Sequence, residues 1–165
     1  DEAVTEAEET GSEKFPAFNG KDFDGNDVDE SIFSQYAVTV VNFWFNGCAP
    51  CVAELPELNS LNESLAEKGG TVIGINSETL DGDADIIAQA KEIMSEQGAS
   101  YRNIYFDSSS EAGKIASDIL AFPTTMLVDR NGNIIGEPIV GGINSEEAMN
   151  ELQQRIDKIL ADDKQ

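Results

Sequence analysis

The sequence contains no histidine, and this absence excludes several classes of enzyme at once. Ser-His-Asp and Cys-His nucleophiles, HExxH zinc sites and iron sites of two histidines and a carboxylate all need an imidazole. Cysteine is scarce too, and the two cysteines present are too few to complete a structural zinc site. We therefore expect no metal ion and no other cofactor.

Basic residues are also few: 10 lysines and arginines stand against 32 aspartates and glutamates, for a formal net charge of −22. Nucleic acids and anionic lipid surfaces select basic patches, so we expect neither as a partner. The sequence also lacks the run of about 18 apolar residues that a membrane-spanning helix needs. It starts at Asp1 without an apolar leader, so we expect that a targeting segment or anchor has been removed.

The first residues differ in composition from the rest. Residues 1–13 carry six acidic side chains, no basic one and no aromatic one, and they show no sustained apolar period. Such a segment repels itself and has nothing to bury. We expect residues 1–14 to be a disordered acidic tether and residues 15–165 to form one domain.

Two acidic stretches, residues 22–29 and 81–85, superficially resemble calcium-binding loops. Asp27 in the first and Ile86 in the second stand where an EF-hand loop requires glycine. Turn and helix-capping chemistry explains both stretches better. Whether residues 78–85 form a lip of a functional site or an ordinary loop stays open.

After residue 14 the sequence alternates between strand and helix patterns. Strands are predicted over residues 37–45, 71–76 and 103–106, helices over 49–67, 84–97, 110–118 and 145–160, and hairpins over 15–29 and 124–140. Turns are expected at Asn19-Gly20, Asp24-Gly25 and Asn131-Gly132, and Pro56 should kink its helix. This order predicts an α/β fold, with parallel pairing early and an antiparallel hairpin late.

The only two cysteines, Cys48 and Cys51, lie three positions apart, where a predicted strand ends and a helix begins. Unpaired N–H groups at a helix start favour the thiolate, so the Cys48 pKa should be low. A structural staple here would close a loop of only about four residues and remove little chain entropy. Pro50 fits the first helical turn and presets the geometry. The pattern therefore indicates a redox dithiol.

The segment VVNFWFNGCAPCVAELPEL, residues 40–58, resembles the active-site segment of thioredoxin-fold proteins. Within them it is most similar to the TlpA/ResA/DsbE group of extracytoplasmic thiol–disulfide oxidoreductases. The resemblance covers about residues 15–160. It implies a thioredoxin-like fold: a central mixed sheet flanked by helices, with an N-terminal β-hairpin extension and a central insertion. It also implies that Cys48 attacks and Cys51 resolves.

Further matches support this resemblance. Trp44 matches the family's aromatic residue before the first cysteine, and Pro56 matches its helix-kinking proline. The segment FPTTMLVDRNGNI, residues 122–134, matches the strand that the family begins with a cis-proline, here Pro123. Gly141-Gly142 falls where the family has glycine near the site. The resemblance implies that substrate is contacted by Trp44, Pro50, Phe122 and Pro123.

Glu54 matches an acidic residue characteristic of the TlpA/ResA group. It follows Cys51 by three residues, about one helical turn, so its side chain can approach that thiol. A partly desolvated carboxyl there would have a raised pKa and could exchange protons with Cys51. The alternative is a solvated helix residue with no catalytic role.

Two departures from the family concern the substrate side of the site. Gly47 stands where the family commonly has tryptophan before the first cysteine, which leaves that side more open. Phe122 precedes Pro123, where smaller residues are common.

The expected function is a thiol–disulfide oxidoreductase. Ala49 and Pro50 lack the charge or donor with which oxidising relatives stabilise a thiolate, which favours a reductase. Apocytochrome c, methionine sulfoxide reductases or misoxidised proteins would all fit as substrates. The family also implies a membrane electron donor of the CcdA/DsbD type. We expect a monomer in the bacterial cell envelope, outside the cytoplasm and tethered to the membrane.

Other functions stay open. A peroxiredoxin-like thiol peroxidase shares this type of fold, but Phe45 occupies the position three before Cys48 where such enzymes have threonine or serine. Copper delivery of the Sco type would need a histidine. A non-catalytic interaction module is the third alternative, and the intact cysteine pair argues against it.

Overall fold

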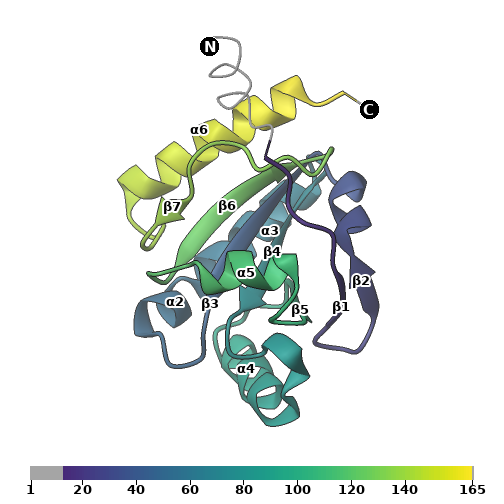
Figure 1. The fold of residues 1–165 in the computed structure, drawn as a ribbon. Coiled ribbons are helices and arrows are strands. Elements are labelled where there is room, and N and C mark those ends of the chain that lie inside the picture. Colours follow the sequence, from purple (N-terminus) through teal and green to yellow (C-terminus); the bar gives the residue numbers. More distant parts are fainter. Residues whose placement is uncertain (1–12, 165) are drawn as a thin grey trace.

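The structure is a computed structural model that describes residues 13–164. Within these residues, seven strands form one mixed sheet in the order β2-β1-β5-β4-β3-β6-β7 (Figure 1). Their bounds are β1 (Asn19–Asp22), β2 (Asp27–Asp29), β3 (Val38–Trp44), β4 (Gly70–Asn76), β5 (Arg102–Phe106), β6 (Thr124–Asp129) and β7 (Ile139–Val140). Strand β4 pairs in parallel with β3 and with β5, and the other pairings are antiparallel.

Helices cover both faces of the sheet. They are η1 (Glu30–Gln35), α2 (Ala49–Ala53), α3 (Leu55–Ala66), η2 (Leu80–Gly82), α4 (Ala84–Glu96), α5 (Glu111–Ser117) and α6 (Glu146–Asp162). Apolar side chains of α3, α4 and α6 form one core with one face, and those of η1 and α5 form a second core with the other. None of the helices within residues 13–164 is long and apolar enough to cross a membrane.

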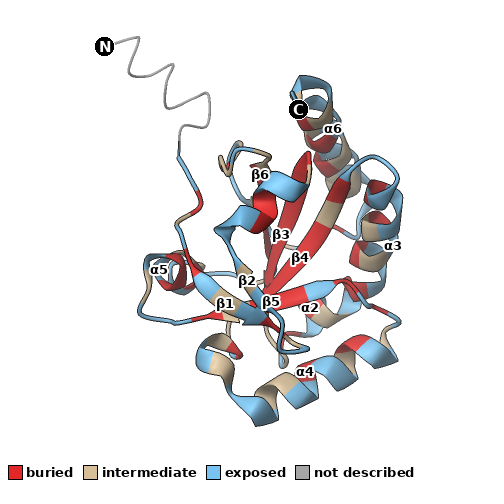
Figure 2. Cartoon of the chain, turned by 90° about the vertical axis from the view of Figure 1, so that its right-hand side faces the viewer, coloured by how far each residue is buried: buried red, intermediate tan, exposed pale blue. Residues whose placement is uncertain are grey.

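Successive side chains of β3 point alternately into the two cores. Val38 and Val40 face the core under α3 and α6, whereas Val41 and Phe43 face the core under η1 and α5. Figure 2 shows β3 and β4 buried along most of their length, as expected for central strands. Because β3 is held on both sides and both faces, its carboxyl end is a rigid support for the residues that follow.

The predicted fold class is confirmed in its main features. The N-terminal hairpin of β1 and β2 extends the sheet beyond β5, and η2 with α4 lies in the chain between β4 and β5. The helix predicted over 49–67 breaks at Glu54 into α2 and α3, just before Pro56, which confirms the kink.

One predicted turn is wrong. Asn19 and Gly20 lie in β1 and form no turn. Glycine is needed at position 20 because β1 packs closely against β5 there. A Cβ atom at this position would collide with the backbone oxygen of Tyr105 on β5. The turn at Asp24-Gly25 is confirmed: the Gly25 N–H donates to the Asp22 oxygen (3.0 Å), and Gly25 has φ 89°.

Turn chemistry accounts for the first of the two acidic stretches that resemble calcium loops. Asp22 accepts N–H groups of Asp24 and Asn26 (both 2.9 Å) and the Asn26 side-chain amide (3.1 Å). Although burial opposes its ionisation, the donors of Asn26 and Asp24 hold the Asp22 pKa below its usual value. Within residues 13–164 no three His, Cys, Asp or Glu side chains form a group that could hold a metal ion.

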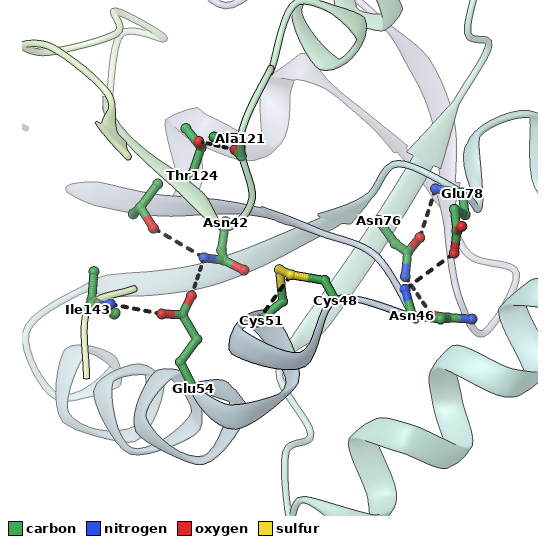
Figure 3. Close-up of a disulfide and its surroundings, with 11 residues drawn as sticks. Asn42, Asn46, Cys48, Cys51, Glu54, Asn76, Glu78, Ala121, Thr124 and Ile143 are labelled. Carbon is green, nitrogen blue, oxygen red and sulfur yellow. Dashed lines mark hydrogen bonds between the residues drawn. A yellow bond between two sulfur atoms is a disulfide. The ribbon is translucent and has the colours of Figure 1, made fainter. Parts of the chain in front are cut away.

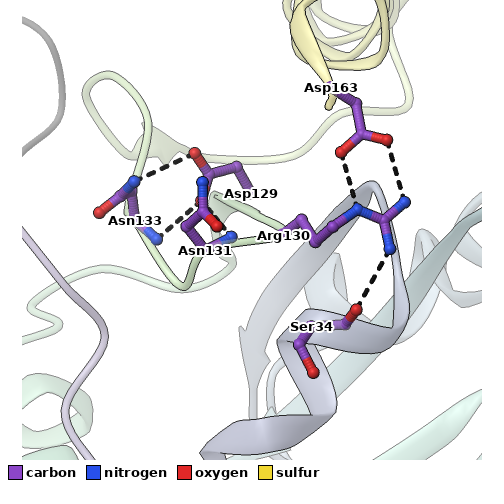
Figure 4. A network of polar contacts seen from close by, with 6 residues as sticks. All are labelled: Ser34, Asp129, Arg130, Asn131, Asn133 and Asp163. Carbon is purple, nitrogen blue, oxygen red and sulfur yellow. Dashed lines mark hydrogen bonds and ion pairs between the residues drawn. The ribbon is translucent and has the colours of Figure 1, made fainter. Parts of the chain in front are cut away.

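The turn after β6 is bonded to η1 and to the end of α6 (Figure 4). Asp129 repeats the Asp22 arrangement with Asn131 and Asn133, which closes the turn predicted there. The Arg130 guanidinium donates two hydrogen bonds to Asp163 (2.8 and 2.9 Å) and one to the Ser34 carbonyl oxygen (3.2 Å). Arg130 therefore joins the end of α6 to η1.

Most of the expected tether, residues 1–12, lies outside the residues that the structure describes. Its last two residues contact the β6 turn. The Glu13 oxygen accepts the Ile134 N–H (2.8 Å), and Lys14 forms an isolated bridge with Asn133.

Candidate active site

The two cysteines lie at the carboxyl end of β3 and are joined by a disulfide. Cys48 is the N-cap of α2, and its sulfur accepts the Cys51 N–H (3.3 Å). Cys48 keeps 6% of its surface exposed and Cys51 keeps none, so an incoming group can reach only Cys48. The N–H donor favours negative charge on the Cys48 sulfur, as predicted for the attacking thiol.

Glu54 lies at the junction of α2 and α3, one turn after Cys51. Its side chain is fully buried. The carboxylate accepts the Asn42 side-chain amide at Oε1 (3.0 Å) and the Ile143 N–H at Oε2 (2.9 Å), as Figure 3 shows. Burial raises the pKa of Glu54, against these two donors, which lower it. Glu54 is therefore a buried carboxyl of raised pKa and not a solvated helix residue, and its proton exchange with Cys51 stays a prediction.

The loop before β6 carries Phe122 and Pro123. The Phe122-Pro123 peptide bond is cis, which confirms that prediction. The Pro123 oxygen accepts the Gly141 N–H (2.8 Å), so the glycine pair also lies where the resemblance placed it. The Thr124 hydroxyl donates to the Ala121 oxygen (2.7 Å) and closes this loop (Figure 3).

An aromatic pair borders the open side of the site. The Phe45 and Phe122 rings pack edge to face with centroids 5.1 Å apart. A Cβ atom at Gly47 would contact only the Phe45 ring, at 3.8 Å. Both Gly47 and Pro50 are exposed. The space left by the missing family tryptophan is therefore open to solvent and flanked by Phe45.

Trp44 is placed differently from the other predicted substrate contacts. Its side chain is fully buried, and its Nε1–H donates to the Asn103 side-chain oxygen (2.8 Å). The Asn103 amide in turn lies 2.9 Å from the Met94 sulfur. The structure thus gives Trp44 a supporting position behind the site, between β3 and α4.

Substitution Trp44→Phe is expected to lower the free energy of unfolding by about 1–3 kcal/mol, because the buried Asn103 oxygen loses its donor. Urea denaturation measures this change. In an Asn103→Ala background the same substitution should cost much less, since the acceptor is gone. Equal costs in the two backgrounds would contradict the supporting role of this hydrogen bond.

The acidic stretch 78–85 is attached to the loop that precedes Cys48. The Glu78 carboxylate accepts the Asn46 N–H (3.3 Å), and the Asn46 amide group donates to the Ile86 oxygen (3.3 Å). Asn76 bridges the two segments, donating to the Asn46 oxygen and accepting the Glu78 N–H (both 2.8 Å; Figure 3). Only Glu78 of the stretch therefore borders the loop before Cys48, whereas Asp81 accepts the Ser108 N–H (2.8 Å) and Asp83 caps α4.

Sequence reasoning gave no role to Asn42. This residue is the hub of the buried polar contacts, since it donates to Glu54 and to the Thr125 hydroxyl (3.1 Å). Two features of the sequence point to Asn42. It is the one amide in the apolar run 37–45, and it lies on the same side of the strand as Trp44. Parity also predicts that both side chains face the core under α3.

A disulfide whose one sulfur is accessible, followed three residues later by a buried carboxyl of raised pKa, is suited to thiol–disulfide exchange. Residues 12–137 match the AhpC/TSA family. The chain belongs to this family.

Two curated relatives agree with the geometry. The chain is 29% identical over 144 residues to the thiol-disulfide oxidoreductase ResA of Bacillus cereus, covering 87% of this chain and 75% of that one. It is 28% identical over 124 residues to the thiol:disulfide interchange protein HelX of Rhodobacter capsulatus, covering 75% and 61%.

Solved structures show the same fold. A thiol:disulfide interchange protein of the thioredoxin family from Chlorobium tepidum superposes with a TM-score of 0.64 at 24% identity, covering 86% of this chain and 94% of that one. A thiol-disulfide oxidoreductase from Bacteroides fragilis gives 0.65 at 23% identity, covering 87% and 99%. These structures confirm the predicted thioredoxin-like fold, and the relatives confirm the prediction of a thiol–disulfide oxidoreductase.

Proposed function

We propose that this member of the AhpC/TSA family reduces disulfide bonds in other proteins outside the bacterial cytoplasm. The observation that carries the proposal is the asymmetry of the dithiol. Cys48 is accessible and accepts an N–H donor, whereas Cys51 is buried near Glu54, three residues further along the chain.

The first step is attack by the Cys48 thiolate on one sulfur of the substrate disulfide. The substrate S–S bond breaks, its other sulfur leaves as a thiolate, and a mixed disulfide joins Cys48 to the substrate. In the second step Cys51 loses its proton to Glu54 and attacks the Cys48 sulfur. The mixed disulfide breaks, the second substrate sulfur leaves, and Glu54 returns the proton to it. Two electrons pass to the substrate, and the Cys48–Cys51 disulfide forms.

Substrate contacts are assigned to the residues around Cys48. Pro50 is exposed, and Phe122 lies half-buried in the loop before β6. Because β6 begins pairing with β3 only at Thr124, the backbone of residues 121–123 extends beyond the sheet. An extended substrate segment would pair along Phe122 and Pro123 while its disulfide meets Cys48. Trp44 would act from behind, by holding the end of β3 in place.

We infer the electron donor and the location from the same resemblance. A membrane dithiol protein of the CcdA/DsbD type would restore the reduced form, and residues 1–14 would tether the domain to the cell envelope. Apocytochrome c, methionine sulfoxide reductases and misoxidised proteins are the candidate substrates. Disulfides persist in such a compartment, which gives a reductase substrates to act on.

Insulin reduction tests this proposal against a peroxidase. With dithiothreitol as electron source, the protein is expected to accelerate insulin precipitation and to leave hydrogen peroxide consumption near the background of dithiothreitol alone. Phe45, at the position where a thiol peroxidase has threonine or serine, is the reason for the second expectation. Faster peroxide consumption without insulin reduction would favour the peroxidase, and neither activity would favour a binding module.

A further inference from the structure

Asn42 has one polar atom whose partner is not accounted for. The residue is fully buried, and both hydrogens of its side-chain amide are used, on Glu54 Oε1 (3.0 Å) and Thr125 Oγ1 (3.1 Å). Its side-chain oxygen is buried and has no hydrogen-bond partner within the described part of the chain. Buried polar atoms are rarely left unpaired, and those that are commonly belong to a functional device.

The orientation of this amide follows from its neighbours. An ionised Glu54 can only accept, so the amide must turn its NH2 group toward the carboxylate. The amide oxygen then points the other way, and Figure 3 shows it turned to the side of the disulfide, toward Cys51. The backbone supports this arrangement, because β3 holds Asn42 and the start of α2 holds Cys51.

We propose that Asn42 is a positioning residue that couples Glu54 to Cys51. In the resting reduced protein, its side-chain oxygen accepts the S–H of Cys51 while its NH2 group holds the Glu54 carboxylate. When Cys51 resolves the mixed disulfide, its S–H turns from this oxygen to the carboxylate and gives up the proton there. This inference rests on the proposed exchange reaction, in which Cys51 is the resolving thiol. It adds the reason why the two thiols differ: an acceptor facing Cys51 favours its protonated form, and the N–H facing Cys48 favours the thiolate there.

The groups that can titrate around Cys51 are few. Cys48 lies beside it, Glu54 faces Asn42 from the junction of α2 and α3, and Tyr101 lies at the start of β5. Burial, and to a smaller extent the charge of Glu54, raises the pKa of Tyr101, so its hydroxyl stays neutral over the working range. A change in Cys51 ionisation after substitution of Asn42 can therefore be assigned to Cys51 and Glu54.

The test is the pKa of Cys51, measured in a Cys48→Ala background from the pH dependence of the ¹³Cβ shift of labelled cysteine. Substitution Asn42→Ala removes the S–H acceptor and the donor to Glu54, and both losses favour the Cys51 thiolate. The pKa should fall by about one unit, a tenfold change in the thiolate-to-thiol ratio. Substitution Asn42→Asp keeps an oxygen toward the sulfur, and its carboxyl shares a proton with the facing Glu54 carboxylate, so the Cys51 pKa should stay at or above that of the parent.

A fall in the Cys51 pKa for Asn42→Ala but not for Asn42→Asp separates positioning from a structural role. Val41→Ala, at the neighbouring residue of β3, removes packing from the other core and should leave the Cys51 pKa unchanged. A fall below about 0.3 units for Asn42→Ala, or a similar fall in Asn42→Asp, would overturn the proposal. If Asn42→Ala does not fold, Asn42→Ser, whose side chain is also too short to reach the sulfur, takes its place with the same expected fall. The Cys51 pKa is measured without a substrate, so a failure of insulin reduction would not affect this result.

Discussion

Replacement of Cys48 by serine is expected to lower disulfide reduction by at least about 1000-fold, because a hydroxyl does not attack a disulfide at neutral pH. The fold should be unaffected, since the disulfide closes a separation of only three residues and adds little to stability. Insulin reduction with dithiothreitol measures the activity, and circular dichroism monitors the fold.

The matched control is Cys51→Ser. It should also stop turnover, but only after one attack, because Cys48 keeps its thiolate and its N–H donor. Cys48 in this variant should still be alkylated rapidly by iodoacetamide at pH 7, whereas Cys51 in the Cys48→Ser variant should react slowly because it is buried. If the Cys48→Ser variant kept half of the parent activity, or Cys51 reacted faster, the assignment of the two roles would be wrong.

Substitution Glu54→Gln is expected to slow the resolution of a mixed disulfide by about 100-fold, at the low end of what a positioned acid–base group contributes. Without histidine in the chain, Glu54 is the best-placed group to accept the Cys51 proton. Because burial raises its pKa, the parent rate should increase with pH through an inflection above the ordinary value of 4.5, and the variant should lack this inflection.

Single-turnover stopped-flow measurements between pH 5 and 9 follow this step, with Glu57→Gln as control, because Glu57 is exposed on α3. Glu57→Gln should match the parent. A Glu54→Gln profile that also matched the parent would show that the buried carboxyl is a bystander.

Stability should depend on Glu54 in a defined direction. Its folded-state pKa is raised above the ordinary value of 4.5, so the folded form binds more protons than the unfolded form between the two values. The contribution of Glu54 to stability is fully present below the unfolded pKa, and it is lost as pH rises through the folded pKa. The melting temperature of the parent should therefore fall relative to that of Glu54→Gln across this window.

The site could be predicted from the sequence where local patterns determine it. The strand over residues 37–45, the dithiol after it and the break before Pro56 all follow from neighbouring residues. The positions of Cys48 and Glu54 in the fold could therefore be predicted. Trp44 was assigned to substrate contact from its match to the family. Its parity with Val38 and Val40 would have placed it in the core instead.

What could not be predicted depends on contacts between distant segments. Glycine occurs both in turns and where two backbones pack closely. The sequence does not distinguish the two cases at Gly20, because its close approach to Tyr105 joins distant segments of the chain. The place of Glu78 beside the loop before Cys48 depends on its contact with Asn46, which lies 32 residues away in the chain. The role of Asn42 depends on Thr125, 83 residues away, and on Glu54 turning inward.

The most direct test of the account is to identify which cysteine carries the substrate. The Cys51→Ser variant is reduced, mixed with a disulfide-containing peptide, quenched with acid and digested without reductant for mass spectrometry. The account predicts a stable adduct of the peptide on Cys48, and no comparable adduct on Cys51 in the Cys48→Ser variant treated in parallel. An adduct that forms on Cys51 as fast as on Cys48, or on neither residue, would contradict it.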